Sequence, residues 1–412
     1  MITLSEDQKV CFDTLVSWYK NPVDFMTLAG YAGTGKSSLI AWFRNFLPET
    51  TRIFFCAYTG KAASVLRSKL VKFGINRFPN DTCGTIHSTI YQPKVKDDEI
   101  DGWVLKQQLE CDLIIVDEAS MISEDIFKDL KSFNKPILFV GDHGQLPPIE
   151  GLLNLMENPI IKLEKVHRFA EQNPLTKISM MARLDGYIPP GWHGDTVVKV
   201  PPKHPLITKF INDSGDFSNT AILCGFNNTR VDLNKKIREW KGYKGSLPQV
   251  GERLICLKNN KNAKKCPIYN GILGTAKYIE PYYNYVKLRV EVDGEHDHYK
   301  GKASKIVFNN AKPILNEFVY SSDDVESDGE DDSVDNMMNR FNSRSRGKRK
   351  SQKIYLDAWD FGYCTTVHKS QGSEWDRVMV IEQNCDFWSG PKWNKWLYTA
   401  VTRAKNELLI VR

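Results

Sequence analysis

A glycine-rich segment near the N-terminus has the residue types and spacing of a phosphate-binding loop. It runs from Gly30 to Ser37 as GYAGTGKS, between an apolar run at 25–29 and a helix-like run at 37–47. Glycines let backbone N–H groups turn toward phosphates, and the helix N-terminus adds positive partial charge. A glycine-rich turn without a ligand fits neither the spacing nor both flanks. The residues expected to hold a nucleotide here are Gly30, Gly33, Thr34, Gly35, Lys36, Ser37 and Ser38.

Two carboxylates supply the expected partner of this loop. Asp117 and Glu118 directly follow the apolar run 113–116. A buried strand ending there would bring Asp117 into a Mg²⁺ shell that Ser37 shares, while Glu118 would act on the attacking water. Alone, such a pair is often only the end of a strand. Beside a phosphate loop it predicts hydrolysis of a nucleoside triphosphate, without choosing among kinases, GTPases and ATPases.

Short apolar runs between helix-like stretches indicate the elements that position these residues. They lie at 25–29, 53–57, 113–118 and 137–140, and a second set lies at 221–224, 378–381 and 408–411. This alternation is typical of parallel α/β sheets. Only the first set has a phosphate loop, so we predict an α/β chain with two parallel-sheet domains.

From 270 to 353 the pattern changes to alternating, strand-like segments, which predict a β-rich insertion. Inside it, residues 323–335 hold eight acids and residues 340–353 hold seven bases. We expect a disordered, solvated loop over about 321–352, because this composition cannot bury a core. Its basic half could also contact nucleic acid or resemble a nuclear signal.

The composition is that of a globular chain with reduced thiols. Among 412 residues, 41% are hydrophobic and 26% charged, and the nine cysteines form no CxxC pair. Neither a disulfide framework nor a zinc site is expected. No apolar run approaches the roughly 20 residues of a membrane span, and the start lacks a signal peptide, so we expect a cytoplasmic protein without a membrane partner. The net charge of +6 decides nothing about partners.

Further motifs follow in a fixed order along the chain. They are TGKAA at 59–63, TIH at 85–87, VDEAS at 116–120, GDHGQLPP at 141–148, Arg168, TTVHKSQGSEWDRVMVI at 365–381 and LYTAVTRAK at 397–405. This set resembles the superfamily 1 helicases. Within that superfamily, the order of the motifs resembles the RecD and Dda group, called subclass 1B, and in particular its phage-type members. The resemblance extends from about Leu4 to the C-terminus and implies two RecA-like domains that share one ATP site.

The resemblance implies roles at that site. Gln8 would bind adenine, Gln145 would sense the γ-phosphate, Glu374 would lie near the ribose, and Arg168 and Arg403 would be arginine fingers. A single arginine is more often a surface ion pair, but the motif context favours the finger. The implied catalytic set is Lys36, Asp117, Glu118, Gln145, Arg168 and Arg403, with Ser37 and Asp117 as metal ligands and ATP and Mg²⁺ as cofactors.

The resemblance also implies a track for single-stranded nucleic acid across the tops of both sheets. Its residues would be Thr59, Gly60, Lys61, Thr85, His87, Thr366, His368 and Ser370. Small donors suit backbone phosphates, so such a track would position a strand without reading its sequence. For the two histidines, a packed or capping role is the alternative.

Two insertions complete the implied organisation. Tyr91 to Trp103 would form a hairpin pin, with a turn at Asp101–Gly102, unless it is a plain surface loop, and the β-rich insertion would be SH3-like. We predict a first motor domain at 1–170 with the pin at about 88–110, a second domain at 171–269 plus 354–412, and the β-rich insertion at 270–353.

The expected activity is ATP-dependent, 5′→3′ translocation on single-stranded DNA that separates duplex strands, with the polarity implied by the resemblance alone. Single-stranded DNA, forked or tailed duplexes and single-strand-binding or replisome proteins are the expected partners of a monomer. The alternatives are an RNA helicase or translocase and an ATPase subunit of a recombination complex. No second carboxylate cluster supports a nuclease.

Overall fold

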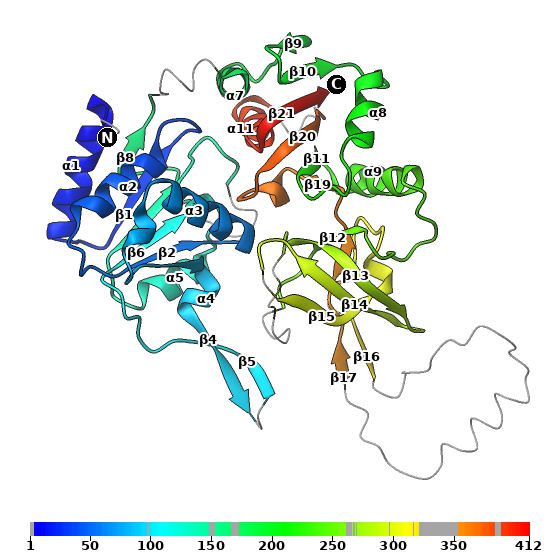
Figure 1. Ribbon diagram of the computed structural model, residues 1–412, viewed down its shortest axis with the longest axis horizontal. Coiled ribbons are helices and arrows are strands. Elements are labelled where there is room, and N and C mark those ends of the chain that lie inside the picture. The colour runs from blue at the N-terminus through cyan, green and yellow to red at the C-terminus, as the bar shows by residue number, and fades with distance from the viewer. Residues whose placement is uncertain are drawn as a thin grey trace, which may run out of the picture. The chain divides into compact units, whose positions relative to one another are not determined.

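The computed structural model describes residues 4–96, 99–147, 153–165, 173–260, 266, 268, 270–295, 297–315, 317–320, 353–383 and 389–412. The chain forms two compact units (Figure 1). The first contains Met1–Ile237, Asp293–Glu295 and Tyr363–Arg412, and the second contains Arg238–Val292 and His296–Gly362. Among the helices of these described ranges, none is both long and apolar enough to span a bilayer.

The first sheet is six-stranded and wholly parallel, in the order β3-β2-β6-β7-β1-β8. Its strands are β1 (Phe25–Gly30), β2 (Ile53–Ala57), β3 (Thr82–Thr85), β6 (Leu113–Asp117), β7 (Ile137–Gly141) and β8 (Ile161–Leu163). The four predicted apolar runs of the first set form β1, β2, β6 and β7. Because all strands point the same way, their carboxyl ends lie along one edge.

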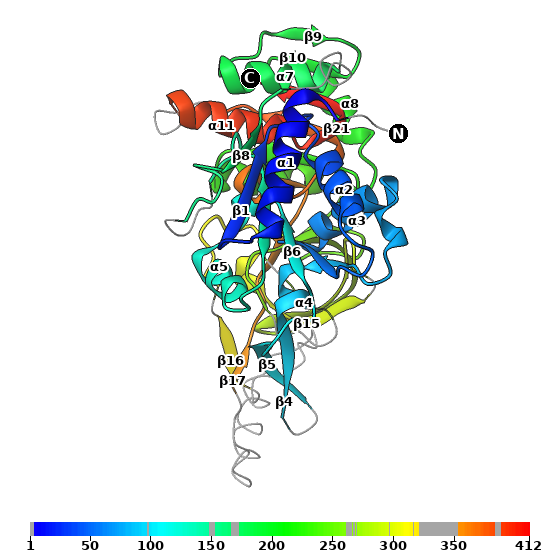
Figure 2. The same ribbon diagram turned by 90° about the vertical axis from the view of Figure 1, so that its left-hand side faces the viewer.

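Helices cover both faces of this sheet. They are α1 (Glu6–Lys20), α2 (Lys36–Phe46), α3 (Gly60–Lys72), α4 (Ile86–Ile90) and α5 (Glu124–Lys131), with short 3₁₀ turns η1 (Ile75–Arg77) and η2 (Ala119–Met121). Residues of α1, α2 and α3 form one buried cluster with the sheet, and residues of α4 and α5 form another. Figure 2 shows α1 and α2 lying against each other over β1, and the two helices are in contact.

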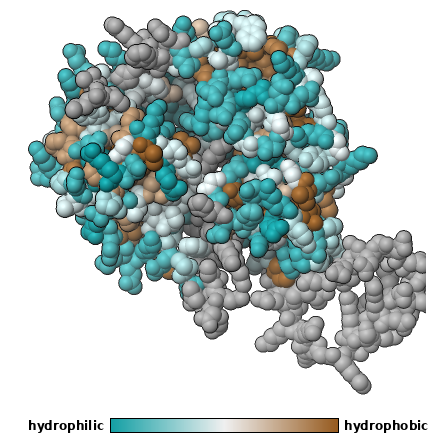
Figure 3. Space-filling view, viewed as in Figure 1, coloured by the Kyte–Doolittle hydropathy of each residue, from teal (hydrophilic) through white to brown (hydrophobic). Residues whose placement is uncertain are grey.

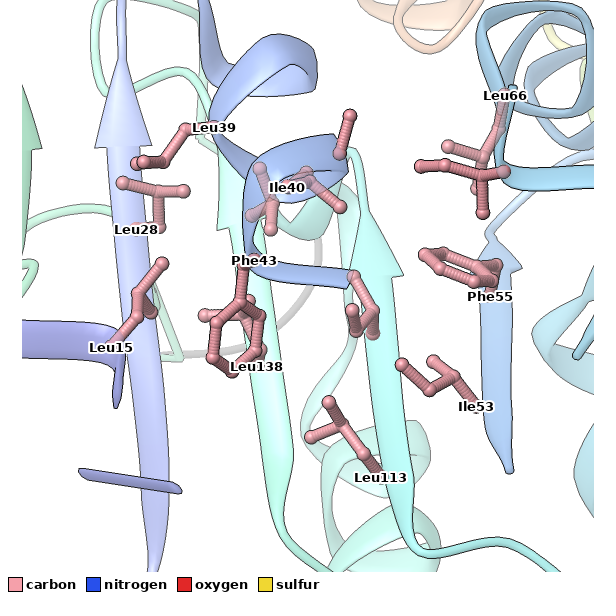
Figure 4. Packing of buried hydrophobic residues seen from close by; sticks show 14 of the residues in the cluster. Leu15, Leu28, Leu39, Ile40, Phe43, Ile53, Phe55, Leu66, Leu113 and Leu138 are labelled. Atoms are coloured by element: carbon pink, nitrogen blue, oxygen red, sulfur yellow. The ribbon is translucent and has the colours of Figure 1, made fainter. Parts of the chain in front are cut away.

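The apolar cluster under α1, α2 and α3 holds in place β1 and α2, the two elements that flank the phosphate loop. Figure 4 shows Leu15 of α1 and Phe43 of α2 packed with Leu28 of β1 and Leu138 of β7, and these side chains are fully buried. Burial of such a side chain contributes about 1.5–3 kcal/mol. Polar residues cover most of the surface seen in Figure 3, where hydrophobic groups are small and scattered.

The second sheet has the order β19-β11-β20-β21-β10-β9 and is parallel except for β9 at its edge. Its strands are β9 (Gly191–His193), β10 (Val197–Val200), β11 (Thr220–Cys224), β19 (Cys364–Thr366), β20 (Trp375–Ile381) and β21 (Ala404–Val411). Its helices are α7 (Pro174–Leu184), α8 (Pro205–Asn212), α9 (Asn227–Trp240) and α11 (Gly390–Val401), with the 3₁₀ turn η5 (His368–Ser370). The second set of apolar runs forms β11, β20 and β21, as predicted.

A buried ion pair lies inside the second sheet. Lys199 Nζ is 2.5 Å from Glu382 Oε2, and the two side chains are 4% and 0% exposed. Lys199 also donates to the carbonyl of Ile188 at 2.8 Å, and Arg412 Nη1 lies 2.8 Å from Glu382 Oε1. Glu382 therefore neutralises two cations, one of them buried.

Replacing Glu382 by leucine is expected to lower the free energy of unfolding by about 3–5 kcal/mol, because Lys199 would keep its buried charge without a carboxylate. Urea denaturation followed by circular dichroism measures this decrease. The matched control is Glu124→Gln, which removes the exposed pair at 2.7 Å between Glu124 and Lys128. It should cost less than about 0.5 kcal/mol, and equal decreases in the two variants would contradict the prediction.

The second unit is built on an antiparallel sheet in the order β15-β14-β13-β12-β18. Its strands are β12 (Arg253–Cys256), β13 (Leu273–Pro281), β14 (Tyr285–Val292), β15 (His298–Ser304) and β18 (Trp359–Phe361), with the turn η3 (Lys305–Val307); β16 (Phe318–Tyr320) pairs with β17 (Lys353–Tyr355). β12 and β18 lie outside the predicted insertion of 270–353. The sheet includes one short strand that precedes this segment, β12, and one that follows it, β18. The predicted loop at 321–352 lies outside the described residues, and an SH3-like identity stays a prediction.

A two-stranded hairpin of β4 (Tyr91–Lys96) and β5 (Glu99–Leu105) occupies the segment predicted as a pin. The predicted turn at Asp101–Gly102 is wrong, because both residues lie within β5 and the pairing closes at Lys96 and Glu99. In both Figure 1 and Figure 2 the hairpin extends away from the first sheet. At its base, the Tyr91 ring stacks on His87 with centroids 5.5 Å apart.

Candidate nucleotide site and strand track

The loop after β1 has the backbone of a phosphate cradle. Gly33 and Gly35 adopt φ of 80° and 83°, a region that favours glycine. Helix α2 begins at Lys36, and no side chain caps its first N–H groups. Lys36 Nζ donates to the carbonyls of Gly30 at 2.5 Å and Tyr31 at 3.0 Å. A helix N-terminus with free N–H groups and an adjacent ammonium suits an anionic ligand.

A cavity of about 290 Å³ lies over this loop, and residues of both parallel sheets line it. The lining residues are Tyr31, Ala32, Gly33, Gly35, Lys36, Ser37, Ser38, Lys69, Asp117, Glu118, Gly141, Asp142, Gln145, Glu374, Thr402 and Arg403. Most predicted nucleotide and catalytic residues therefore meet here. Predicted Arg168 lies outside the described residues.

Three predicted residues are not among those that line the cavity. Gly30 closes β1, and a Cβ there would meet Thr34 Oγ1 at 2.6 Å. Thr34 is fully buried and donates to the carbonyl of Tyr31 at 2.8 Å. Gln8 accepts from the Ser5 N–H at 3.1 Å and donates to the Thr34 carbonyl at 3.5 Å. These three residues contact the phosphate loop or one another and do not line the cavity. Adenine binding by Gln8 stays a prediction.

Glu118 has the geometry of an activated base. Its φ of 55° places a non-glycine residue in the left-handed region, a strain of about 1–3 kcal/mol that is common at functional sites. Its N–H donates to Asp117 Oδ1 at 3.0 Å. Burial, together with the Asp117 charge, raises the pKa of Glu118. Its Oε2 is buried and has no hydrogen-bond partner within the described ranges, which leaves an acceptor for a water.

Arg403 is a buried cation for which the described residues provide no carboxylate partner. It is 2% exposed and donates to the carbonyls of Thr399 at 3.0 Å and Ser373 at 3.2 Å. Among the residues that the structure describes, no carboxylate lies within ion-pair distance of its guanidinium. A buried charge is costly unless it is paired, so this position favours a bound anion. Gln145 Oε1 likewise has no partner in the described part of the chain.

Lys69 of α3 is a cavity residue that the sequence motifs miss. Burial by itself lowers the pKa of Lys69, but the charges of Asp117, Glu374 and Glu118 outweigh it and raise the pKa. The ammonium is therefore held charged beside the carboxylates. No local pattern could have found it, because its carboxylate neighbours come from distant segments.

Tyr398 of α11 joins the two parallel sheets at the phosphate loop, which sequence reasoning also missed. Its hydroxyl accepts from the Ala32 N–H at 2.8 Å and donates to Asp142 Oδ2 at 2.6 Å. Burial and the Asp142 charge raise the pKa of Tyr398, so the hydroxyl keeps its proton. The tyrosine is part of the motif LYTAVTRAK, in which the arginine is the residue with an evident chemical role.

Other cross-sheet contacts surround this tyrosine. The Arg183 guanidinium of α7 lies 3.6 Å from the centroid of the Tyr31 ring, whose other neighbour, the His143 ring 4.1 Å away, follows β7 of the same first sheet. Gln371 Nε2 donates to the Leu146 carbonyl at 2.6 Å. A change in the conformation of the phosphate loop would therefore alter its contacts with Tyr398 of α11 and Arg183 of α7, which pack on the second sheet.

Several predicted track residues use their hydroxyls inside the fold. Thr59 caps α3 by accepting from the Ala62 N–H at 3.1 Å. Thr85 caps α4 by accepting from the Ser88 N–H at 3.1 Å. Ser370 donates to the Val367 carbonyl at 2.8 Å. These side chains shape the strand-end loops, as small capping residues do.

The remaining track residues lie at the same kind of position. Gly60 is the first residue of α3, Thr366 ends β19, and His87 is buried in α4. Burial lowers the pKa of His368, which begins η5. Lys61 lies in α3, and its side chain is outside the described part. Thr85 and Asp117 are both in register with Ala57, so this predicted track residue and the predicted metal ligand lie at the carboxyl ends of β3 and β6, on either side of β2.

Comparisons with known proteins agree with this arrangement. Residues 3–185 match the family model of an AAA domain, and residues 361–411 match that of a UvrD-like helicase C-terminal domain. The ATP-dependent RecD2 DNA helicase of Deinococcus radiodurans is 24% identical over 98% of this chain, which spans 48% of that longer protein. The ATP-dependent DNA helicase dda of Enterobacteria phage T4 is 24% identical over 99% of both chains.

A solved structure of the Pif1 helicase from Bacteroides, in complex with ADP-AlF3 and ssDNA, shares the fold. Its TM-score is 0.51 at 16% identity, and the match covers 100% of this chain and 92% of that one. Two parallel sheets around one phosphate loop define a P-loop NTPase with two RecA-like domains. With its ordered motifs and both family matches, the chain belongs to the superfamily 1 helicases, in the RecD/Dda-like group.

Proposed function

We propose that this helicase uses ATP hydrolysis to move 5′→3′ along single-stranded DNA and to separate duplex strands. The observation that carries the proposal is the nucleotide cavity lined by both parallel sheets. Asp117 ends β6 of the first sheet, with Glu118 next to it and Lys36 at the start of α2, whereas Glu374 and Arg403 directly precede β20 and β21 of the second sheet. A ligand in that cavity would contact both sheets, which is the requirement for coupling chemistry to movement. Polarity follows from the resemblance to subclass 1B.

The residues present fit ATP and Mg²⁺. The phosphate loop and Lys36 would hold the phosphates, and Ser37 and Asp117 would hold Mg²⁺, which supplies charge stabilisation at the transferring phosphoryl group. Glu118 accepts a proton from the attacking water as the new P–O bond forms and the bond to ADP breaks. Arg403, with Arg168 as a second finger, balances the developing charge. Gln8, Gln145 and Glu374 would contact adenine, γ-phosphate and ribose.

The second sheet would register the state of the nucleotide through Tyr398. Its hydroxyl holds the Ala32 N–H of the phosphate loop and the Asp142 carboxylate. The proposed track residues lie at the carboxyl ends of strands of the same sheets or in the first turn of the helix that follows such a strand. Alternating grip on Thr59, His87 and their neighbours in the first sheet and on Thr366 and His368 in the second would move the strand, and the hairpin β4–β5 would act as the wedge.

The test is ATP-dependent unwinding of two matched DNA duplexes that differ only in carrying a 5′ or a 3′ single-stranded tail. Unwinding from the 5′ tail alone is the expected result, with ADP in place of ATP as the inactive control. A preference for the 3′ tail would contradict the proposed 5′→3′ polarity but would still support an ATP-driven helicase motor. An RNA tail that stimulates ATP hydrolysis more than DNA would contradict the choice of DNA.

A further inference from the structure

The second unit has four basic residues on one face of its antiparallel sheet, which we call the basic face: Lys287, Arg289, Lys300 and Lys302. Lys287 pairs with Lys302 and Arg289 with Lys300 in the register of β14 and β15. Residues two apart on a strand share a face. The alternate residues Val286, Leu288 and Val290 are buried in the opposite direction. The basic face is therefore the outer side of the sheet, with like charges directly opposed twice.

Like charges opposed across a sheet are destabilising. The Lys287–Lys302 pair is partly relieved, because Lys287 Nζ lies 3.4 Å from Glu280 and 4.2 Å from the centroid of the Tyr282 ring. Lys302 Nζ lies 4.5 Å from the centroid of the Tyr285 ring. Arg289 and Lys300 have no such relief, since no carboxylate of the described residues lies within ion-pair distance of either. Two cations thus remain without a counterion in the described part of the chain.

The same face is hollowed. An open trough of about 520 Å³ has the four basic residues, Tyr278 and Gly301 in its lining. Tyr278 pairs with Arg289 across β13 and β14, so it borders the uncompensated cations. The opposed like charges destabilise the fold, and a trough lined by positive charge attracts anions. This combination indicates an anionic ligand of extended shape.

We propose that the basic face binds the phosphate backbone of duplex DNA. Single strands are held by aromatic platforms on which bases stack. Here the Tyr282 and Tyr285 rings are buried and stack on each other, 4.8 Å apart, which leaves Tyr278, 45% exposed, as the single aromatic ring among the described residues that line the trough. Four cations beside one aromatic ring suit a backbone whose bases are already paired, since phosphate contacts position a duplex without reading it and need no row of rings for bases to stack on.

The basic face is separate from the proposed strand track. It rests on the proposed function in one respect, because a motor that separates strands encounters a duplex. An acidic protein segment is the competing occupant, since this chain has eight acids of its own in 323–335. Binding of a DNA duplex and of polyglutamate, measured side by side over a salt series, distinguishes the two occupants, with a slope of about 0.9 expected for each duplex phosphate neutralised.

The experiment compares the double variant R289Q/K300Q with K277Q in the full chain. Lys277 is the matched control, because it lies on the same sheet but is paired with Glu291 at 2.7 Å. Fluorescence anisotropy over a salt series measures binding of a blunt DNA duplex, an oligothymidine and polyglutamate. For the duplex, R289Q/K300Q is expected to reduce the slope of log K against log salt by about 1–2, since each neutralised phosphate accounts for about 0.9 of that slope. Oligothymidine binding should be unchanged.

Two further measurements keep the outcomes separate. The thermal midpoint of R289Q/K300Q should equal or exceed that of the unmodified chain, because like-charge repulsion is removed, so weaker binding cannot reflect unfolding. ATP hydrolysis stimulated by oligothymidine should be unchanged, and its absence in the unmodified chain would count against the proposed motor alone. The basic-face proposal is overturned if the duplex slope matches that of K277Q, if oligothymidine binding falls equally, or if polyglutamate binding alone is abolished.

Discussion

Replacing Arg403 by alanine is expected to lower the rate of DNA-stimulated ATP hydrolysis by about 10³ to 10⁵, the range found when an arginine finger is removed. The buried guanidinium lines the nucleotide cavity without a carboxylate partner in the described residues, so its charge is available to the transferring phosphoryl group. Binding of ATP should change little, because the phosphate loop is intact. Steady-state hydrolysis with saturating oligothymidine gives kcat and KM separately.

Two other arginine variants make this result specific. Arg403→Lys keeps the charge but removes the planar fork, so it should recover only part of the rate. Arg377→Ala is the matched control on the same sheet, because Arg377 is paired with Glu407 at 2.6 Å and does not line the cavity. A kcat within tenfold of the unmodified chain in Arg403→Ala would show that Arg403 is a structural residue.

The predictable parts of the fold were those fixed by local patterns. β1, β2, β6 and β7 match their apolar runs to within a residue or two, because a buried parallel strand is apolar on both sides. The phosphate loop was predictable because its function requires particular residues at fixed spacing. β12 and β18 were not, since strands of four and three residues carry too little pattern to mark where a sheet begins.

Residues whose roles depend on long-range contacts could not be found from local patterns. Tyr398 reaches Ala32 across 366 positions, and Lys69 gains its carboxylate neighbours only when the sheet forms. Thr59 and Thr85 also accept from backbone N–H groups as helix caps, a role that the motifs do not reveal, while their contact with a strand stays a prediction. A motif names the residues of a site, but it does not say which of them act on the ligand and which shape the loop.

Glu118 is the proposed general base. Replacing Glu118 by glutamine is expected to lower kcat for ATP hydrolysis by about 10² to 10⁴, the usual contribution of a positioned base. Glutamine keeps the size and the hydrogen-bonding capacity of the side chain, so ATP and single-strand binding should persist. Glu124→Gln, in α5 beside the same sheet, is the control with unchanged rate. Retention of kcat in Glu118→Gln would assign proton transfer to another group.

Stability gives Glu118 a second readout that activity does not. Burial and the Asp117 charge raise the pKa of Glu118, so the ionised carboxylate costs the folded state free energy at neutral pH. Glu118→Gln should therefore raise the unfolding midpoint at pH 7. The gain should disappear as pH falls toward the carboxyl's unfolded pKa of about 4.3, because the native side chain is then protonated too. A decrease in kcat with a gain in stability would show that the buried charge is retained for chemistry, whereas a decrease in both would indicate a structural role.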